Sequence, residues 1–271
     1  MKNITSLYPN KQNRHRYAKL KYGQRFLVNE RYIDMEVSSA SINSSDRVLE
    51  IGGGTGNLTE KLIEKTDKVT VIEKDPYMVE YLKKRFRNST VKIIEGDFLE
   101  IDLSKYRIDK IVSNIPYNLS SPILYRIYTM KFESAVIIFQ KEFADRLTAH
   151  TGSKDYSRLT VTSYLHADIY KLFDLPADAF DPPPEVRSTA VKIIPVSERS
   201  DKVLSEEFTD QFIRVLFMHR RKKIRTILKD YMDMETPPEF MQYPDMRVEQ
   251  IEPEEIIKLS NSLYRKKIES H

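Results

Sequence analysis

Strand-like and helix-like segments alternate along the first half of the chain, and no other feature constrains the fold as strongly. Apolar runs that are expected as strands occur at residues 46–52, 68–75, 91–97, 108–114 and 133–140. Amphipathic stretches that are expected as helices occur at residues 30–40, 58–66, 76–86, 121–130 and 141–150. Such βαβ units build a mostly parallel sheet with helices on both faces. The sequence therefore predicts an α/β fold.

The pattern changes after residue 150. Residues 158–175 and 188–196 are expected as two further strands that pair at the sheet edge. Between them, FDPPPEVRS (180–188) holds three consecutive prolines, which favour a stiff extended segment and are excluded from a central strand. From Val196 onward the chain is charged and helix-forming. We expect a basic N-terminal extension (1–21), a main domain (22–196) and a small helical domain (197–271).

The cations of the chain are clustered rather than in large excess. Lysine and arginine number 44 against 40 acids, which gives a net charge of +4. Residues 1–29 contain no acid, and HRRKKIR (219–225) is a second basic cluster. Such clusters favour a phosphate-rich partner such as RNA, because lysine and arginine displace condensed counterions. A solvated tail and a solvated helix face remain the alternative.

The chain has no cysteine, which excludes disulfides, thiolate metal sites and a cysteine nucleophile. Neither a signal peptide nor an apolar run of membrane-spanning length is visible. We therefore expect a cytoplasmic protein with no metal and no membrane partner, and a monomer is the simplest expectation.

A glycine-rich loop, EIGGGTGNLTE (50–60), leads from the first predicted strand into a helix. Gly52, Gly54 and Gly56 occupy alternate positions, and glycine is needed where a backbone passes close to a ligand. Asn57 stands where the dinucleotide fingerprint Gly-x-Gly-x-x-Gly requires its third glycine. No Gly-Lys-Ser/Thr follows either, so the loop is not of the nucleoside-triphosphate type. A purely structural turn remains open.

Acidic residues end the next two predicted strands. Glu73 can accept hydrogen bonds from both hydroxyls of a ribose, and Asp97 can accept one from an adenine amino group. Both lie at the edge of the sheet where ligands bind in open α/β folds. With the glycine loop, this layout is the one expected of an S-adenosylmethionine site, to which Lys74 and Phe98 would also belong. Each acid taken singly can equally be a solvated loop residue.

The fourth predicted strand ends in Asn114-Ile115-Pro116-Tyr117, a motif that suits methyl transfer to an adenine amine. Such an amine is a poor nucleophile, because its lone pair is delocalised into the ring. Two groups are expected to accept hydrogen bonds from this amine: the side-chain oxygen of Asn114 and the backbone carbonyl of Ile115. The carbonyl is available because Pro116 has no N–H that could pair with it locally. Tyr117 is expected to stack on the base. A sulfonium methyl is already activated, so positioning and charge complementarity would carry catalysis.

Six segments then carry a resemblance to a known family. In order, they are YGQRFL (22–27), LEIGGGTGNLTE (49–60), SNIPYNLSSPIL (113–124), FQKEFADRL (139–147), FDPPPEVRS (180–188) and HRRKKIRTIL (219–228). Over residues 14–230 the chain resembles the ribosomal RNA adenine N6-dimethyltransferases, which dimethylate two adjacent adenines near the 3′ end of small-subunit ribosomal RNA. The short C-terminal domain is similar to that of archaeal members. The resemblance implies a Rossmann-like S-adenosylmethionine-dependent methyltransferase fold with a small C-terminal all-helical domain.

The resemblance also implies roles for individual residues. Gln24, Arg25 and Leu27 would close the cofactor site, and Phe180 would lie on the second face of the target base. Gly53 stands where many members have proline, a difference that should only loosen the turn. The residues implied to contact S-adenosylmethionine are Gly52, Glu73, Asp97 and Asn114. The residues expected to meet RNA phosphates, without choosing the base, are Arg220, Arg221, Lys222, Lys223 and Arg225.

Other functions share parts of this pattern. A large-subunit ribosomal RNA adenine methyltransferase of the antibiotic-resistance type has the same fold and strand-four motif, whereas the triple proline and HRRKKIR favour the small-subunit family. DNA adenine methyltransferases usually have an acid in place of Asn114. A non-catalytic RNA-binding assembly factor is the alternative from another class, since mitochondrial transcription factors that resemble this family reuse the fold as a binder. We expect modification together with a checkpoint on small-subunit maturation.

Overall fold

The computed structural model describes residues 25–269, and these form two compact units. The first unit contains the described residues up to Ala144 together with Tyr170–Ile194. The second contains Asp145–Ile169 and the described residues from Pro195 onward. The sequence placed a single boundary at residue 196, whereas the structure assigns residues 145–169 to the helical unit as well. The predicted N-terminal extension (1–21) lies outside the described residues.

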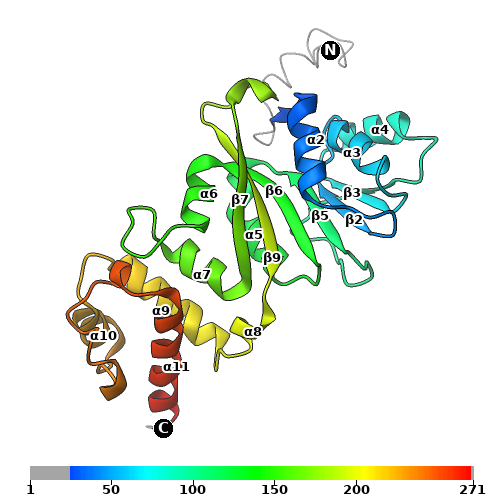
Figure 1. Cartoon of the computed structure of the whole chain (residues 1–271). Helices are drawn as coiled ribbons and strands as arrows, with labels where there is room; N and C mark the ends of the chain where they lie inside the picture. The colour runs from blue at the N-terminus through cyan, green and yellow to red at the C-terminus, as the bar shows by residue number, and fades with distance from the viewer. Residues whose placement is uncertain (1–24, 270–271) are drawn as a thin grey trace. The chain divides into compact units, whose positions relative to one another are not determined.

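A seven-stranded sheet forms the centre of the first unit, and its strands lie side by side in Figure 1. Its order is β4 (Lys92–Glu95), β3 (Val69–Glu73), β2 (Val48–Ile51), β5 (Lys110–Asn114), β6 (Ser134–Gln140), β9 (Ser188–Pro195) and β7 (Ala167–Leu175). Strands β4 to β6 pair in parallel, and β9 pairs antiparallel with β6. The five strands predicted in the first half of the chain are confirmed, and so is the additional pair at the edge.

Five helices alternate with these strands, as the sequence predicted. They are α2 (Glu30–Ser39), α3 (Asn57–Ile63), α4 (Pro76–Arg85), α5 (Ser120–Tyr128) and α6 (Lys141–Leu147). The start of α4 shows why these segments are helical. Pro76 occupies the first turn, where its missing N–H costs nothing, and Asp75 caps the helix by accepting a 2.9 Å hydrogen bond from the backbone N–H of Tyr77.

Both faces of the sheet are buried, as a parallel sheet requires. One set of alternate strand residues packs with α2, α3 and α4: Val48, Val69, Val71, Val112, Val136 and Ile138. The residues between them are buried as well: Leu49, Ile72, Ile111 and Ile137. The carboxyl ends of the strands carry polar residues and glycines instead, so this edge of the sheet is available for a binding site.

One predicted strand is partly wrong. Residues 158–166 form a helix, α7 (Arg158–His166), and only the following residues continue as β7. The β-branched residues of this segment favour a strand, but Val161 and Leu165 pack into the core of the helical unit. The sequence signal for the helix is Ser157, whose backbone N–H donates to Thr160 Oγ1 in a capping box.

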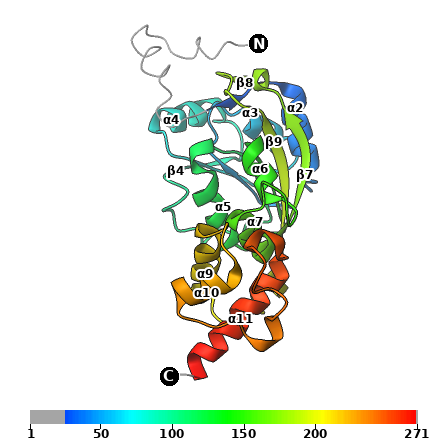
Figure 2. The same ribbon diagram turned by 90° about the vertical axis from the view of Figure 1, so that its left-hand side faces the viewer.

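The second unit confirms the predicted helical C-terminal region. Besides α7 it contains α8 (Ser197–Ser200), α9 (Glu206–Met218), α10 (Ile224–Met232) and α11 (Pro253–Glu269). Figure 2 shows α9, α10 and α11 together. One face of α9 packs into their shared core, where Phe208, Phe212 and Leu216 are buried.

A short two-stranded ribbon accompanies the main sheet of the first unit. Strand β1 (Phe26–Leu27) pairs antiparallel with β8 (Phe180–Asp181), with Leu27 opposite Phe180. This pairing places the start of the triple-proline segment beside the first described residues of the chain. Within residues 25–269 no helix combines the length and the apolar character that a membrane span needs.

Candidate active site

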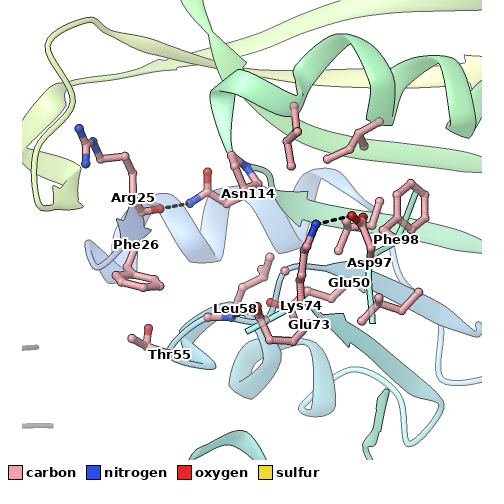
Figure 3. A pocket seen from close by; sticks show the side chains of 18 of the residues that line it. Arg25, Phe26, Glu50, Thr55, Leu58, Glu73, Lys74, Asp97, Phe98 and Asn114 are labelled. Carbon is pink, nitrogen blue, oxygen red and sulfur yellow. Dashed lines mark hydrogen bonds and ion pairs between the residues drawn. The ribbon is translucent and has the colours of Figure 1, made fainter. Parts of the chain in front are cut away.

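A cavity of about 190 Å³ opens at the carboxyl ends of β2, β3, β4 and β5 (Figure 3). Most residues that the sequence predicted for the cofactor line it: Arg25, Leu27, Gly52, Gly54, Glu73, Lys74, Asp97, Phe98 and Asn114. Gln24, also predicted, lies outside the described residues. Sequence reasoning missed other lining residues, among them Phe26, Glu50, Thr55 and Leu58. The motifs YGQRFL and EIGGGTGNL contain all four, but their letters do not tell which side chains face the cavity.

Two glycines of the loop are required by its shape. Gly52 has a φ of +79°, and a Cβ added there would meet nothing within 4 Å. Gly54 has a φ of +49°, and a Cβ there would lie 2.8 Å from the ring of Phe26. Both backbones therefore adopt conformations that favour glycine; at Gly52 the space of a side chain is open, whereas at Gly54 the Phe26 ring occupies it.

The other two glycines pack against the protein instead. Gly56, predicted to bind the cofactor, does not line the cavity: it precedes α3 with a φ of +79°, and its Cβ would lie 2.7 Å from the ring of Phe86. A Cβ on Gly53 would lie 2.5 Å from Val71 Cγ1 and 2.8 Å from Leu82 Cδ1. A Cβ at Gly53 would therefore require one of these side chains to move, and the expectation that glycine in place of proline only loosens the turn stays a prediction.

Glu73 holds the glycine loop while lining the cavity. Its carboxylate accepts 2.9 Å hydrogen bonds from the backbone N–H groups of Gly54 and Asp75, one on each oxygen. Burial raises the pKa of Glu73, and these hydrogen bonds oppose that shift. Each oxygen keeps a second lone pair. The carboxylate is thus fixed in position and still able to accept from a ligand.

Asp97 forms the opposite wall with Lys74, as Figure 3 shows. Lys74 Nζ lies 2.5 Å from Asp97 Oδ2, and the backbone N–H of Leu99 donates to Oδ1 at 2.9 Å. The hydrogen bond from Lys74 is the main cause that lowers the pKa of Asp97. Asp97 is therefore a carboxylate, and so an acceptor, at neutral pH.

Arg126 on α5 fixes the loop that carries Asp97. Its guanidinium donates to the backbone carbonyls of Leu99 and Ile101 and lies 5.3 Å from the centroid of the Phe98 ring. No local pattern in the sequence marks this residue, because the contact joins a helix to a loop 25 residues earlier.

Two buried carboxyl groups lie beneath the cavity. Glu50 lines it with an exposed fraction of 1%, and Thr59 Oγ1 donates to its Oε2 at 2.6 Å. Burial raises the pKa of Glu50 to about 8. Glu36 on α2 is fully buried, and neither of its carboxyl oxygens has a hydrogen-bond partner within residues 25–269. Burial, with the nearby Glu50, raises the pKa of Glu36 as well. Glu50 is therefore mainly protonated at neutral pH, and burial favours the protonated form of Glu36 as well.

The strand-four motif lies at the mouth of this cavity. Asn114 Nδ2 donates a 2.9 Å hydrogen bond to the backbone carbonyl of Arg25, which Figure 3 shows as a dashed line. This bond sets the orientation of the amide and leaves Oδ1 as its acceptor end. Pro116 lines the cavity, whereas the Ile115 side chain is buried. Tyr117 lies outside this cavity.

A second cavity, of about 440 Å³, adjoins the first, because Arg25 and Asn118 line both. It is also lined by Tyr117, Gln140, Pro184, Glu185 and Val186. The hydroxyl of Tyr117 forms a hydrogen bond with Ser188 Oγ, which holds the ring against β9. Residues 117 and 184–186, which are distant in sequence, therefore line one hollow beside Asn114.

Phe180 is not where the sequence placed it. Its side chain has an exposed fraction of 3% and packs in the core of the first unit. The pairing of β8 with β1 directs this ring inward, because Phe180 is held opposite Leu27. Phe180 lines neither of the two cavities. The structure therefore does not support the expected contact with a base.

The predicted RNA-binding cluster is partly neutralised in the helical unit. Arg220 pairs with Glu249 at 2.8 Å. Lys223 and Arg225 share Asp245 at 2.8 and 3.0 Å. Of the other two cations in the cluster, Lys222 places its Nζ 5.0 Å from the centroid of the Tyr231 ring, and Arg221 is exposed.

No group of three or more histidine and acidic side chains within residues 25–269 is arranged to hold a metal ion.

Comparison with known proteins adds an independent finding. The model of a family described as ribosomal RNA adenine dimethylase matches residues 15–265. A probable ribosomal RNA small subunit methyltransferase A from Methanococcoides burtonii is 39% identical over 256 residues, which cover 90% of this chain and 93% of the relative. One from Methanopyrus kandleri is 40% identical over 207 residues, which cover 76% and 74%.

Solved structures show the same likeness. A dimethyladenosine transferase from Plasmodium falciparum superposes with a TM-score of 0.78 at 29% identity, over 89% of this chain and 98% of that one. The 23S rRNA methyltransferase ErmE superposes with a TM-score of 0.66 at 23% identity, over 88% and 99%, and shows the shared fold.

Proposed function

The chain belongs to the ribosomal RNA adenine dimethylase family, and on this premise we propose that it transfers methyl groups from S-adenosylmethionine to the N6 amines of two adjacent adenosines near the 3′ end of small-subunit ribosomal RNA. The product is N6,N6-dimethyladenosine, formed during maturation of the small subunit. The observation that carries this proposal is the position of Asn114, which lines the first cavity while its amide is oriented by the backbone carbonyl of Arg25, a residue that lines both cavities.

The first cavity, at the carboxyl ends of β2 to β5, fits S-adenosylmethionine. Gly52 leaves space where a side chain would project, the fixed carboxylate of Glu73 has lone pairs for ribose hydroxyls, and Asp97 is an ionised acceptor for an adenine amine. Arg25 and Leu27 close the cavity from β1, and Lys74 and Phe98 complete its wall. When bound, the cofactor supplies a methyl group on a positively charged sulfonium, which needs no further activation.

Asn114 and Ile115 would act on the target amine. Asn114 Oδ1 and the carbonyl of Ile115 accept its two N–H groups, which favours a tetrahedral nitrogen whose lone pair faces the methyl group. The backbone carbonyl of Arg25 accepts a hydrogen bond from Asn114 Nδ2, and this bond keeps Oδ1 directed toward the substrate in our proposal. Catalysis would then depend on positioning and fixed dipoles rather than on a general base.

Tyr117 and the second cavity would hold the target base. An aromatic ring offers a stacking face to an adenine that has left its helix. The hydrogen bond to Ser188 fixes the ring of Tyr117 at the wall of this cavity. We place the base here rather than against Phe180, whose ring is buried in the core.

The helical unit would contact RNA phosphates through its basic cluster. Arg221 and Lys222 carry most of this role in our proposal, because acids pair with Arg220, Lys223 and Arg225. Such contacts position the enzyme without selecting the base. We propose the cytoplasm as the compartment, since a small subunit would meet the chain there, and a monomer as the assembly.

Methyl transfer from labelled S-adenosylmethionine tests the proposal. Small subunits that lack adenine dimethylation, naked small-subunit RNA and large subunits serve as parallel substrates, and mass spectrometry identifies the product. Dimethyladenosine on small subunits alone is expected. Label on large-subunit RNA would instead assign the chain to the antibiotic-resistance type. Tight binding to small subunits without transfer would leave a binding factor and would remove the catalytic role of Asn114.

A further inference from the structure

The second cavity contains an amide side chain whose hydrogen-bonding groups are unused. Gln140 is the last residue of β6 and lines this cavity with Tyr117 and Asn118. Its side-chain amide has no hydrogen-bond partner within residues 25–269. A glutamine amide offers two N–H donors and one carbonyl acceptor, so Gln140 retains its full capacity for a ligand.

The sheet register fixes the direction of Gln140. It pairs directly with Ser188 of β9, and directly paired residues project from the same face of a sheet. Ser188 in turn holds the hydroxyl of Tyr117. Gln140 therefore lies beside the proposed stacking ring.

Asn114 projects from the same face. It pairs with Ile138 across β5 and β6, and Gln140 follows Ile138 by two residues, which returns a strand to the same face. Asn114, Gln140 and Ser188 therefore share one face at the carboxyl edge of the sheet, around the second cavity.

We propose that Gln140 is a specificity residue that donates a hydrogen bond from its amide to a ring nitrogen of the target adenine, N1 or N7. This inference rests on the proposed function. Both ring nitrogens are acceptors and flank the N6 amine, N1 on the Watson–Crick edge and N7 on the major-groove edge. Asn114 and Ile115 would accept from N6 while Gln140 donates to the ring, so the cavity would match the donor–acceptor pattern of adenine.

This pattern would reject guanine. Guanine presents an oxygen in place of N6, which would face the acceptor oxygen of Asn114. If Gln140 donates to N1, it adds to this rejection, because N1 of guanine carries a hydrogen; if it donates to N7, which is an acceptor in both purines, it positions the base and leaves the rejection of guanine to Asn114. A buried site built to pair with one pattern leaves its own groups unpaired when another base enters. Gln140 would therefore add base recognition to the stacking by Tyr117, which accepts any base.

A chemical double-mutant cycle tests the inference. Small subunits are reconstituted with RNA that carries adenosine, 1-deazaadenosine or 7-deazaadenosine at the two target positions. Single-turnover methyl transfer is measured for the wild-type chain, Gln140→Ala and Gln140→Glu. Glutamate keeps the size of glutamine but lacks its N–H donors at neutral pH. Gln211→Glu, at an exposed position on α9, is the control for the added charge.

On adenosine, Gln140→Ala and Gln140→Glu are expected to slow transfer about tenfold, the loss of one hydrogen bond. One deaza analogue should slow the wild-type chain by a similar factor and should slow Gln140→Ala no further. Gln211→Glu should behave as wild type, and calorimetry should give every variant the wild-type affinity for S-adenosylmethionine.

Two outcomes would overturn the inference. If Gln140→Ala slowed transfer by the same factor on adenosine and on both analogues, its effect would be structural and no contact with the ring would exist. A loss of cofactor affinity in the variants would point the same way. If the wild-type chain bound S-adenosylmethionine but methylated no adenosine, the proposed function would itself be wrong, and the inference with it.

Discussion

Asn114 Nδ2 donates a hydrogen bond of 2.9 Å to the backbone carbonyl of Arg25, which lies 89 residues earlier in the chain. The bond ties the end of β5 to the residue before β1, and β1 is itself paired with β8. The orientation of one amide at the proposed reaction centre thus depends on segments from three parts of the sequence. A change in any of them would alter which atom Asn114 presents to a substrate.

Asn114→Asp is the sharpest test of this relationship. Aspartate has the same shape but no N–H, so a carboxylate oxygen would face the Arg25 carbonyl. The repulsion and the lost donor should turn this half-buried side chain and lower the rate of methyl transfer by roughly tenfold to a hundredfold, since about 1–3 kcal/mol is lost when a polar group is left unpaired. Single-turnover rates with unmethylated small subunits give the measurement.

A matched control exists in the helical unit. Asn261 Nδ2 also donates to a backbone carbonyl, that of Lys202, at 2.8 Å. Asn261→Asp removes the same kind of donor outside the proposed site, and its transfer rate should stay at the wild-type value. Equal rate losses in both variants would show that Asn114 matters only for folding.

Arg126 should control the affinity for the cofactor rather than the chemical step. Arg126→Met removes both hydrogen bonds to the carbonyls of Leu99 and Ile101 and frees the loop that carries Asp97. We expect the dissociation constant of S-adenosylmethionine to rise about tenfold by calorimetry, with the rate at saturating cofactor little changed. Arg47→Met, which breaks the ion pair with Asp109 in the same unit, is the control. An unchanged dissociation constant in Arg126→Met would contradict the prediction.

Glu36→Met should stabilise the protein, and more so at high pH. The folded pKa of Glu36 is raised above its ordinary value of 4.5, so the folded state holds a proton that the unfolded chain loses. The free energy of unfolding is therefore least affected by Glu36 below pH 4.5, where the group is protonated in both states, and it falls as the pH rises. The gain in melting temperature on Glu36→Met should therefore be larger at pH 9 than at pH 5.

The size of this gain follows from the unpaired oxygens of Glu36. A buried polar group without a hydrogen bond costs about 1–3 kcal/mol, and methionine fills a similar volume without that cost. Glu80→Met, at an exposed position on α4, should give no pH-dependent gain. A gain for Glu36→Met that is equal at pH 5 and pH 9 would show that Glu36 does not titrate as described.

Glu50 should make cofactor binding pH-dependent. The carboxyl lines the cavity and its pKa is about 8, so it is mainly protonated at pH 7 in the free protein. A cationic ligand favours the ionised form, so binding should release a proton, and affinity should rise from pH 6 to pH 8.

The contrast between cofactor and product checks this. S-Adenosylhomocysteine lacks the sulfonium charge, so its affinity should change less with pH. Glu50→Gln should abolish the slope for S-adenosylmethionine, and calorimetry in buffers of different ionisation enthalpy should no longer detect a released proton. The same slope in wild type and Glu50→Gln would assign the titration to another group.

The predictions from sequence succeeded where a local pattern decides the structure. The five parallel strands follow from their apolar runs, and the acids at the strand ends follow from the topology, which brings Glu73 and Asp97 to one edge. The segment at 158–166 was misread because burial in the helical core outweighed its β-branched residues.

Contacts between distant residues were beyond the sequence. The pairing of Leu27 with Phe180 directs the Phe180 ring into the core, although the resemblance implied a contact with the target base. No local pattern in the sequence indicates this pairing. Likewise, α2 places Glu36 on its buried side, against the ordinary rule that charged residues face solvent.

Gly53 gives a final prediction about the shape of the glycine loop. A methyl group at this position would lie 2.5 Å from Val71 Cγ1 and 2.8 Å from Leu82 Cδ1, so Gly53→Ala should force a shift in the strand or the loop. We expect a loss of about 1–3 kcal/mol in the free energy of unfolding, measured by urea denaturation, together with weaker binding of S-adenosylmethionine.

A second substitution tests the cause. Val71→Ala alone should destabilise by leaving a small cavity, but in the Gly53→Ala background it removes the clashing methyl group. The double variant should therefore lose clearly less than the sum of the two single losses, because the new methyl of residue 53 fills the space left at residue 71. Losses that add fully would show that the two positions do not touch.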